Sequence, residues 1–132
     1  MSKIETARGK MVTDSQIPEK NILVVEDDED TAQLLGLRLL MAGYGVRIAR
    51  NRDEALEHIK RNIYHFILLD YFMSGTNMEV FLKETEKYCP ISKIVLTTAS
   101  PDALEVAKKH GLKHYFVKPI DTEVLLRFLS VY

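Results

Sequence analysis

The stretch Phe66-Ile67-Leu68-Leu69-Asp70 decides how the rest of the chain is interpreted. Its four consecutive apolar residues follow neither a helical nor an alternating period, which is typical of a strand buried on both faces of a parallel sheet. Burying such a side chain contributes about 1.5–3 kcal/mol. The strand ends in a carboxylate, and ligands bind in the crevice at the carboxyl ends of parallel strands. Asp70 is therefore a candidate functional residue, although a turn or helix-start position would explain it equally well.

The composition fits one globular domain without a membrane segment. The 132 residues suffice for a self-contained core, and no apolar run approaches the roughly 20 residues that span a bilayer. Residues 1–16 lack the apolar centre of a secretory signal, and the single cysteine, Cys89, agrees with a reducing compartment. The formal charge of −1 argues against a basic nucleic-acid-binding surface. We therefore expect a cytoplasmic protein that binds neither nucleic acid nor membrane directly.

Apolar strands alternate with helices after a polar leader. Residues 1–20 show no hydrophobic periodicity and are predicted to be a flexible leader, followed by one domain over residues 21–132. Strands are predicted at residues 21–25, 44–49, 66–70, 93–98 and 114–117. Helices are predicted to end near residue 42, to span about 53–61, 78–88 and 102–110, and to follow Asp121 as the cap of the last one. Five strands alternating with five helices predict right-handed crossovers and a doubly wound α/β sandwich, with helices on both faces of a parallel sheet.

A run of five acids, residues 26–30, follows the first strand and opens the first helix. Glu29 and Asp30 in the first turn complement the helix dipole. The acids before the helix begins need another explanation, because their mutual repulsion has to be relieved. The apolar stripe of this helix, closed by Gly43, is predicted to consist of Leu34, Leu35, Leu39 and Ala42.

The remaining polar residues fall where predicted strands end, namely Glu26, Asp27, Asp70, Thr98 and Lys118. Because parallel strands all point one way, these side chains are expected to share one crevice. Three crowded carboxylates raise the pKa of at least one of them unless a cation intervenes. Oxygen ligands of this kind suit Mg²⁺, which accepts one or two carboxylates plus phosphate oxygens. A lysine and a hydroxyl beside them suit phosphoryl transfer, which is mostly positioning and charge neutralisation; a Lys–Asp salt bridge with capping hydroxyls is the structural alternative.

This set of residues resembles the receiver domain of two-component response regulators, the CheY-like family. The resemblance covers residues 21–132 and is carried by residues 22–28, 68–70, 73 with 75, 96–99 and 115–119. It implies a flavodoxin-like sheet of five strands in the order 2-1-3-4-5. That order comes from the family and not from the periodicity of this chain.

The resemblance implies roles for four residues at the centre of the site. Asp70 looks like the phosphoacceptor that attacks the phosphohistidine of a partner kinase. Asp27 looks like a direct Mg²⁺ ligand, with Glu26 acting mainly through coordinated water. The backbone carbonyl of Phe72 would be a further protein ligand beside Asp27 and Asp70. Mg²⁺ is thus the implied cofactor, with Mn²⁺ as a substitute.

The resemblance also implies a switch and partners. Lys118 would pair with the phosphoryl oxygens, and Thr98 would hydrogen-bond them once they are present. Tyr115 would be the aromatic switch that follows the displacement of Thr98, and Pro119 matches the cis-proline of the family. The implied phosphodonor is a sensor histidine kinase or a histidine phosphotransfer protein. A downstream protein or a second receiver would bind the face made by the last two helices and the last strand, and the chain would be no enzyme beyond catalysing its own phosphorylation and autodephosphorylation.

Three positions depart from the pattern of the family. Ser74 stands where the family often has proline, and Asn77-Met78 replaces a common Asp-Gly pair. Phe72 is larger and less polar than many members carry. We hypothesise that Phe72 shields the acyl phosphate from water and lengthens its life.

Alternatives from other classes remain. One is a pseudo-receiver that is never phosphorylated and acts as an interaction module, which the altered segment 70–78 makes more plausible. A phosphohydrolase with an Asp nucleophile usually carries a second acid two residues further on, where this chain has Phe72. A flavin-binding domain would need a Gly/Ser/Thr-rich phosphate loop after the first strand, where this chain has acids. The receiver is expected either to stand alone or to belong to a longer protein.

Overall fold

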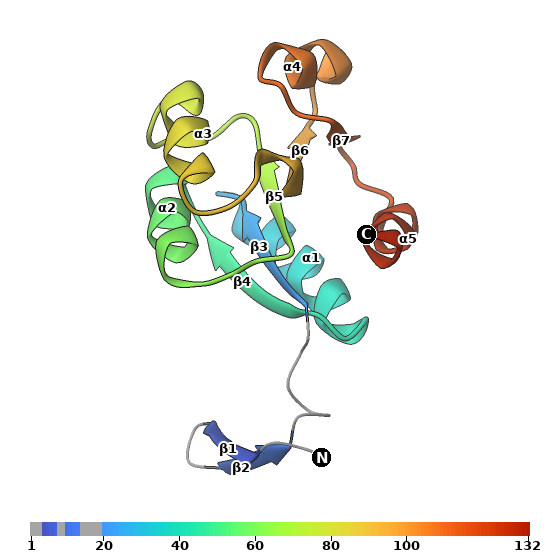
Figure 1. Ribbon diagram of the computed structural model, residues 1–132. Helices are drawn as coiled ribbons and strands as arrows, with labels where there is room; N and C mark the ends of the chain where they lie inside the picture. The colour runs from blue at the N-terminus through green and yellow to red at the C-terminus, as the bar shows by residue number, and fades with distance from the viewer. Residues whose placement is uncertain (1–3, 8–9, 14–19) are drawn as a thin grey trace.

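A single parallel sheet forms the centre of the domain (Figure 1). The computed structural model describes residues 4–7, 10–13 and 20–132. The sheet consists of β3 (Asn21–Val25), β4 (Gly45–Ala49), β5 (Phe66–Asp70), β6 (Ile94–Thr98) and β7 (His114–Val117). Its order is β4-β3-β5-β6-β7, with every neighbouring pair parallel. Counted in chain order, these strands lie as 2-1-3-4-5, which confirms the predicted fold class.

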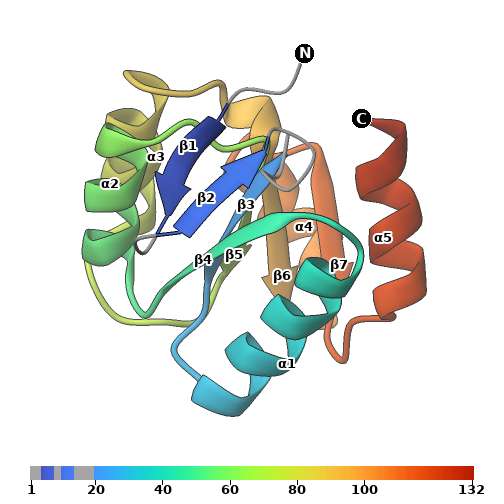
Figure 2. The same cartoon turned by 90° about the horizontal axis from the view of Figure 1, so that it is seen from below.

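Helices cover both faces of this sheet (Figures 1 and 2). They are α1 (Glu29–Met41), α2 (Arg52–Arg61), α3 (Met78–Glu86), α4 (Ala103–Lys109) and α5 (Thr122–Val131), with a short 3₁₀ turn, η2 (Ile91–Lys93). Buried residues of α1 and α5 belong to one apolar cluster, and those of α2, α3 and α4 to another. The two clusters are the two sides of a three-layer sandwich. In the described ranges, no helix has both the length and the apolar character needed to cross a bilayer.

Burial along the strands follows their place in the sheet. All five residues of β5 are buried, and so are all five of β6. The edge strand β4 is buried only at Ala49, and the edge strand β7 alternates half-buried with exposed residues. This difference explains why Phe66 to Asp70 shows a continuous apolar run, since an interior strand of a parallel sheet has helices on both sides.

The apolar stripe of α1 is displaced from the predicted one. Its buried residues are Ala32, Leu35, Gly36 and Leu39. Leu34 and Ala42, which were predicted to belong to the stripe, are exposed. Positions i, i+3, i+4 and i+7 face one way on a helix, and the sheet covers only that face. Gly43 follows the helix with a φ of 97°, as its predicted role as terminator requires.

The element boundaries differ from the predicted ones by one or two residues. Helix α2 starts one residue early, at Arg52, because the side chain of Asn51 accepts the hydrogen bond of the Glu54 N–H. Helix α3 ends at Glu86 instead of residue 88. Strand β6 starts one residue late because the 3₁₀ turn η2 takes up Lys93.

The first residues contain two strands where none was predicted. Strands β1 (Ile4–Ala7) and β2 (Lys10–Thr13) pair as an antiparallel two-stranded sheet. Each run is four residues long, too short for its period to stand out in the sequence. Residues 1–3, 8–9 and 14–19 of the predicted leader lie outside the described residues, so the leader and the domain boundary at residue 21 stay predictions.

Candidate functional site

Alternation along the strands brings three charged side chains to one face of the sheet. Two members of the apolar cluster under α1 and α5, Val24 and Leu68, lie two residues before Glu26 and Asp70. Phe116, which packs against the same cluster, lies two residues before Lys118. Side chains two apart on a strand point to the same side. The three therefore continue that cluster past the carboxyl ends of β3, β5 and β7. The Lys118–Pro119 peptide bond is cis, as the family resemblance predicted.

Lys118 contacts both buried acids. Its Nζ donates to Oε1 of Glu26 at 2.5 Å and lies 3.3 Å from Oδ2 of Asp70. The side chains of Glu26, Asp70 and Lys118 are 5%, 7% and 22% exposed. Because water and salt screen such charges only weakly, the three groups set one another's protonation.

The two acids respond in opposite directions. Burial alone raises the pKa of Glu26, but the hydrogen bonds from Lys118 and from the Asp28 N–H outweigh it and hold the pKa below the usual range. Burial together with the neighbouring Glu26 raises the pKa of Asp70 to about 6, although Lys118 opposes this. Burial lowers the pKa of Lys118, yet its bond to Glu26 and the Asp70 charge raise it overall. Asp70 is thus the carboxylate whose charged form the site favours least.

A third carboxylate completes an acidic cluster. Ligand oxygens of Glu26, Asp27 and Asp70 all lie within 4.8 Å of one another. Three carboxylates and one ammonium leave a net charge of −2, which a divalent cation neutralises. Carboxylate oxygens are the ligands that Mg²⁺ prefers, so the residues present fit this ion. Both oxygens of Glu26 already accept hydrogen bonds, from Lys118 and from the Asp28 N–H at 3.2 Å.

Asp28, the next acid of the run, belongs to the helix instead of the site. It is the N-cap of α1, and its Oδ2 accepts from the N–H of Thr31 at 2.9 Å. The same oxygen accepts from the hydroxyl of Thr31. These hydrogen bonds with Thr31 hold the pKa of Asp28 below its usual value. Within the run of acids, Glu26 and Asp27 therefore belong to the acidic cluster, whereas Asp28 starts the helix.

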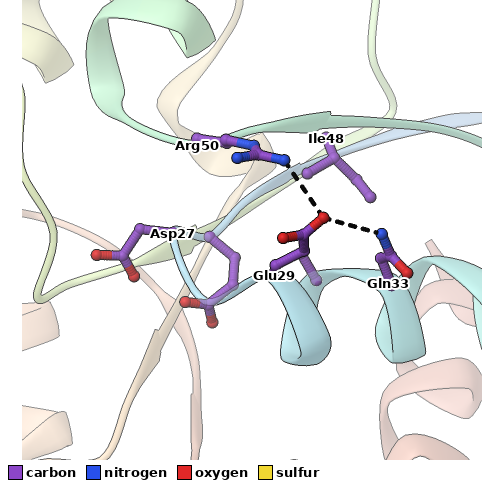
Figure 3. A pocket seen from close by; sticks show the side chains of 7 residues that line it. Asp27, Glu29, Gln33, Ile48 and Arg50 are labelled. Carbon is purple, nitrogen blue, oxygen red and sulfur yellow. Dashed lines mark hydrogen bonds and ion pairs between the residues drawn. The ribbon is translucent and has the colours of Figure 1, made fainter.

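Glu29 lies at the rim of a pocket beside the cluster, shown in Figure 3. The pocket has a volume of about 210 Å³, and Asp27, Glu29, Ile48 and Arg50 line it. Arg50 Nη2 lies 3.5 Å from Oε1 of Glu29, and Gln33 donates to the same oxygen at 3.4 Å. Both members of the ion pair are largely exposed, so it contributes little to stability. Glu29 is paired at the rim and adds nothing to the acidic cluster.

The structure places the predicted hydroxyl and aromatic residues near, but not in, this cluster. Thr98 is fully buried at the end of β6, where its Oγ1 accepts from the N–H of Ser100 at 3.1 Å. Its carbonyl accepts from the N–H of Lys118 at 2.8 Å, which ties the two strand ends together. Tyr115 pairs in register with Leu96, so Tyr115 and Thr98 share one face of the sheet. No hydrogen bond found among the described residues links Thr98 to Asp70.

Phe72, whose backbone carbonyl was predicted to bind the metal, lies in the loop after β5. Its side chain is 62% exposed. The ring packs edge-on against that of Tyr71, with 4.9 Å between the centroids. The loop thus presents an aromatic side chain to solvent two residues beyond Asp70.

The sequence analysis missed Arg52. This first residue of α2 is buried, and its guanidinium donates to the backbone carbonyls of Thr76, Met73 and Tyr71 at 2.5, 3.1 and 3.4 Å. In the sequence it precedes two acids at a helix start, a pattern typical of a solvated helix end. No local signal distinguishes it from the exposed arginines of the chain, because its partners lie about 20 residues away.

Comparisons with known proteins agree with this arrangement. A family model described as the response regulator receiver domain matches residues 22–130. The chain is 33% identical over 112 residues to the transcriptional regulatory protein ZraR of Klebsiella oxytoca, covering 83% of this chain and 25% of ZraR. It is 33% identical over 109 residues to the uncharacterized transcriptional regulatory protein YkoG of Bacillus subtilis, covering 80% of this chain and 47% of YkoG. The chain thus spans between a quarter and half of the length of these relatives.

Solved structures show the same fold. The receiver domain of the Francisella response regulator 1452 has a TM-score of 0.74 and 25% identity, with 86% of this chain and 95% of that one covered. The response regulator protein TrrA of Thermotoga maritima, solved in complex with Mg²⁺ and BeF, has a TM-score of 0.73 and 28% identity. That comparison covers 85% of this chain and 97% of TrrA.

Proposed function

This chain belongs to the response regulator receiver domain family, and we propose on that basis that Asp70 accepts a phosphoryl group from the phosphohistidine of a sensor histidine kinase or a histidine phosphotransfer protein. Receiver domains are signalling modules and not enzymes in the ordinary sense. One observation carries the proposal: the buried Asp70 carboxylate lies 3.3 Å from an ammonium group and within 4.8 Å of two further carboxylates. The site thus combines a nucleophile, a positive counter-charge and carboxylate ligands for a divalent ion.

The proposed step exchanges one phosphorus bond for another. A carboxylate oxygen of Asp70 attacks phosphorus, an O–P bond forms, and the P–N bond to the donor imidazole breaks. The imidazole leaves with the electron pair of that bond. Lys118 pairs first with the Asp70 carboxylate and then with the phosphoryl oxygens that become attached to it. Its Nζ already lies 3.3 Å from Asp70, and the hydrogen bond to Glu26 at 2.5 Å keeps it there.

We assign the metal ligands by the oxygens that remain available. When bound, Mg²⁺ supplies positive charge to the phosphoryl oxygens. Asp27 and Asp70 would hold it through carboxylate oxygens, and Phe72 through its backbone carbonyl. Glu26 would act through coordinated water, because both of its oxygens already accept hydrogen bonds. Mn²⁺ has the same preference for oxygen ligands and is expected to replace Mg²⁺.

The switch is proposed to run from Thr98 to Tyr115. The hydroxyl of Thr98 would donate to a phosphoryl oxygen once the group is attached and so move toward Asp70. Tyr115, which shares its face of the sheet, would then turn into the space that Thr98 leaves. Leu104 on α4, Val117 on β7 and Val124 on α5 are exposed apolar side chains of the three elements of this face, and Tyr115 itself is partly exposed. We propose this surface as the place where a downstream protein or a second receiver binds.

Phosphorylation by a small donor tests the proposal. Incubation with acetyl phosphate and Mg²⁺, followed by intact mass measurement, is expected to add the mass of one phosphoryl group to the wild type. Asp70→Asn should add none. Asp102→Asn, which changes an exposed acid at the start of α4, should be phosphorylated like the wild type. An adduct that persists in Asp70→Asn, or that never forms in the wild type, contradicts the assignment.

The unphosphorylated interaction module is the second candidate. It is favoured by the start of α3, where Met78 is buried in the core and a bulky side chain has replaced a usual glycine. Beryllofluoride with Mg²⁺ imitates a bound phosphoryl group. If beryllofluoride together with Mg²⁺ causes no chemical-shift changes in Asp70, Thr98 or Lys118, this second candidate is the correct one.

A further inference from the structure

We propose that Arg52 is a positioning residue for the metal site. Its guanidinium holds the backbone on both sides of Phe72, so that the carbonyl of Phe72 is kept in place for the cation. The inference rests on the proposed function, in which that carbonyl is a metal ligand. It extends the site to the first turn of α2, an element that carries none of the acids, the hydroxyl or the lysine.

The guanidinium is buried among carbonyl oxygens. Its Nε donates to Thr76 O at 2.5 Å and its Nη2 to Met73 O at 3.1 Å, and Nη1 makes a weaker hydrogen bond to Tyr71 O at 3.4 Å. The Arg52 backbone N–H donates to Ser74 O, also at 3.4 Å. No ion pair found among the described residues includes Arg52. A buried charge has to be compensated, so these carbonyls are what keeps the side chain in place.

Two further contacts attach the same loop to α2. The hydroxyl of Thr76 donates to the carboxylate of Asp53, the second residue of the helix. Gly75 lies so close that a Cβ on it would come within 2.9 Å of the backbone nitrogen of Arg52. The loop from residue 71 to 76 is therefore packed directly on the first turn of α2.

Holding Tyr71 O and Met73 O limits the freedom of the carbonyl between them. Each carbonyl lies in a rigid peptide plane, so the planes before and after the 72–73 peptide are both fixed. The Tyr71 and Met73 side chains pack against the core, while Phe72 points to solvent. Hydrogen bonds within the described part of the chain engage Tyr71 O and Met73 O but not Phe72 O. Of the three carbonyls at residues 71–73, the one without such a hydrogen bond is the proposed ligand.

Mg²⁺ has strict requirements that make such support useful. It demands nearly ideal octahedral geometry, and loss of a group that orients a metal ligand typically weakens metal binding about 10- to 100-fold. Electrostatics alone predict the opposite sign, because removing a nearby positive charge should strengthen the binding of a cation. Weaker Mg²⁺ binding after loss of Arg52 therefore indicates a positioning role, whereas tighter binding indicates an effect of its charge alone.

The experiment compares Mg²⁺ affinities by calorimetry and by amide chemical shifts. Arg52→Gln is expected to weaken binding about tenfold or more, even though it removes a cation. Arg52→Lys keeps the charge but cannot reach three carbonyls, and it should lie between Arg52→Gln and the wild type. Arg61→Gln is the matched control, because Arg61 ends the same helix and is largely exposed in a pair with Glu57. It should bind Mg²⁺ like the wild type.

Amide hydrogen exchange without metal tests the support itself. Residues 71–76 should exchange faster in Arg52→Gln than in the wild type. If Arg52→Gln does not fold, the exchange of the same residues is compared between Arg52→Lys and the wild type. Unchanged exchange, or faster exchange with unchanged or tighter Mg²⁺ binding, would overturn the inference. A wild type that binds no Mg²⁺ would instead overturn the proposed function, and the exchange data would still show whether Arg52 orders the loop.

Discussion

Two buried acids compete for one ammonium group at the centre of the site. Glu26 has the shorter bond to Lys118, 2.5 Å against 3.3 Å for Asp70, and keeps its charge more readily. Asp70 is left with a pKa of about 6, raised first by burial and then by Glu26. The residue proposed to attack phosphorus is thus the one whose negative charge the fold tolerates least. Formation of the proposed acyl phosphate would remove this carboxylate charge from its buried position.

Replacing Asp70 with asparagine should therefore stabilise the fold at neutral pH. A pKa of about 6 in the folded state, above about 3.9 in the unfolded chain, means that the wild type loses stability as pH rises from about 4 to about 6. Asparagine does not titrate. Without metal, Asp70→Asn is expected to exceed the wild type by about 3 kcal/mol at pH 7.5 and by little below pH 4.

Urea unfolding of both proteins across this pH range measures the difference. Asp102→Asn, at an exposed position, should not reproduce the pH-dependent gain. Equal stabilities of Asp70→Asn and the wild type at pH 7.5 would show that Lys118 already compensates the Asp70 charge.

Phe72 should slow the loss of the phosphoryl group. Its exposed ring lies two residues beyond Asp70, where an apolar group hinders the approach of water. Phe72→Asn is expected to raise the autodephosphorylation rate severalfold, whereas Phe72→Leu should change it less. Release of phosphate from the phosphorylated protein is the measurement, and an unchanged or slower rate in Phe72→Asn ends this hypothesis.

At the scale of elements, the first turn of α2 and the loop after β5 form one unit. Asn51 caps the helix, Arg52 binds three loop carbonyls, and Asp53 accepts from Thr76. The loop connects the buried strand β5 to α3, and four of its backbone carbonyls accept hydrogen bonds from Arg52. Its order is therefore provided by a helix that lies some 20 residues earlier in the chain.

Gly75 is required in this unit for two reasons. Its φ of 109° is a conformation that other residues rarely adopt, and a Cβ would lie 2.9 Å from a backbone nitrogen. Gly75→Ala is expected to cost about 2–3 kcal/mol, measured by urea unfolding. Gly43→Ala is the matched control, since Gly43 has a φ of 97° but no atom within 4 Å of its Cβ. A loss at Gly75 no larger than that at Gly43 would show that the close packing on Arg52 costs nothing.

At the scale of the whole molecule, the site exists only where separate strands end together. Glu26 and Lys118 are 92 residues apart in the chain yet share a hydrogen bond. The two apolar clusters hold the sheet between its helices and so fix the distance between the acids. Charge repulsion at the site is the cost of this arrangement, and a bound cation should reduce it.

Mg²⁺ should therefore stabilise the whole domain. At a concentration of 100 times Kd, a ligand that binds only the folded state adds about 2.7 kcal/mol to the free energy of unfolding. Asp27→Asn, which removes an exposed carboxylate of the cluster, should lose most of this gain while folding normally. Thermal unfolding with and without Mg²⁺ provides the comparison. A gain of the same size in Asp27→Asn would mean that the ion binds elsewhere.

The sequence by itself determined the strands, the helices and the residues at the strand ends, because these follow from local periods, caps and turn residues. It did not show which of five adjacent acids would be buried, cap a helix or pair at the rim. Nor did it show Arg52, the exposure of Leu34 or the strands of the first residues. The contacts of Glu26 and Arg52 depend on partners distant in sequence, and the exposure of Leu34 depends on which face of α1 the sheet covers. The first two strands are too short for their period to show. Only the tertiary structure decided them, because burial and pairing between distant residues set the energy of a charge.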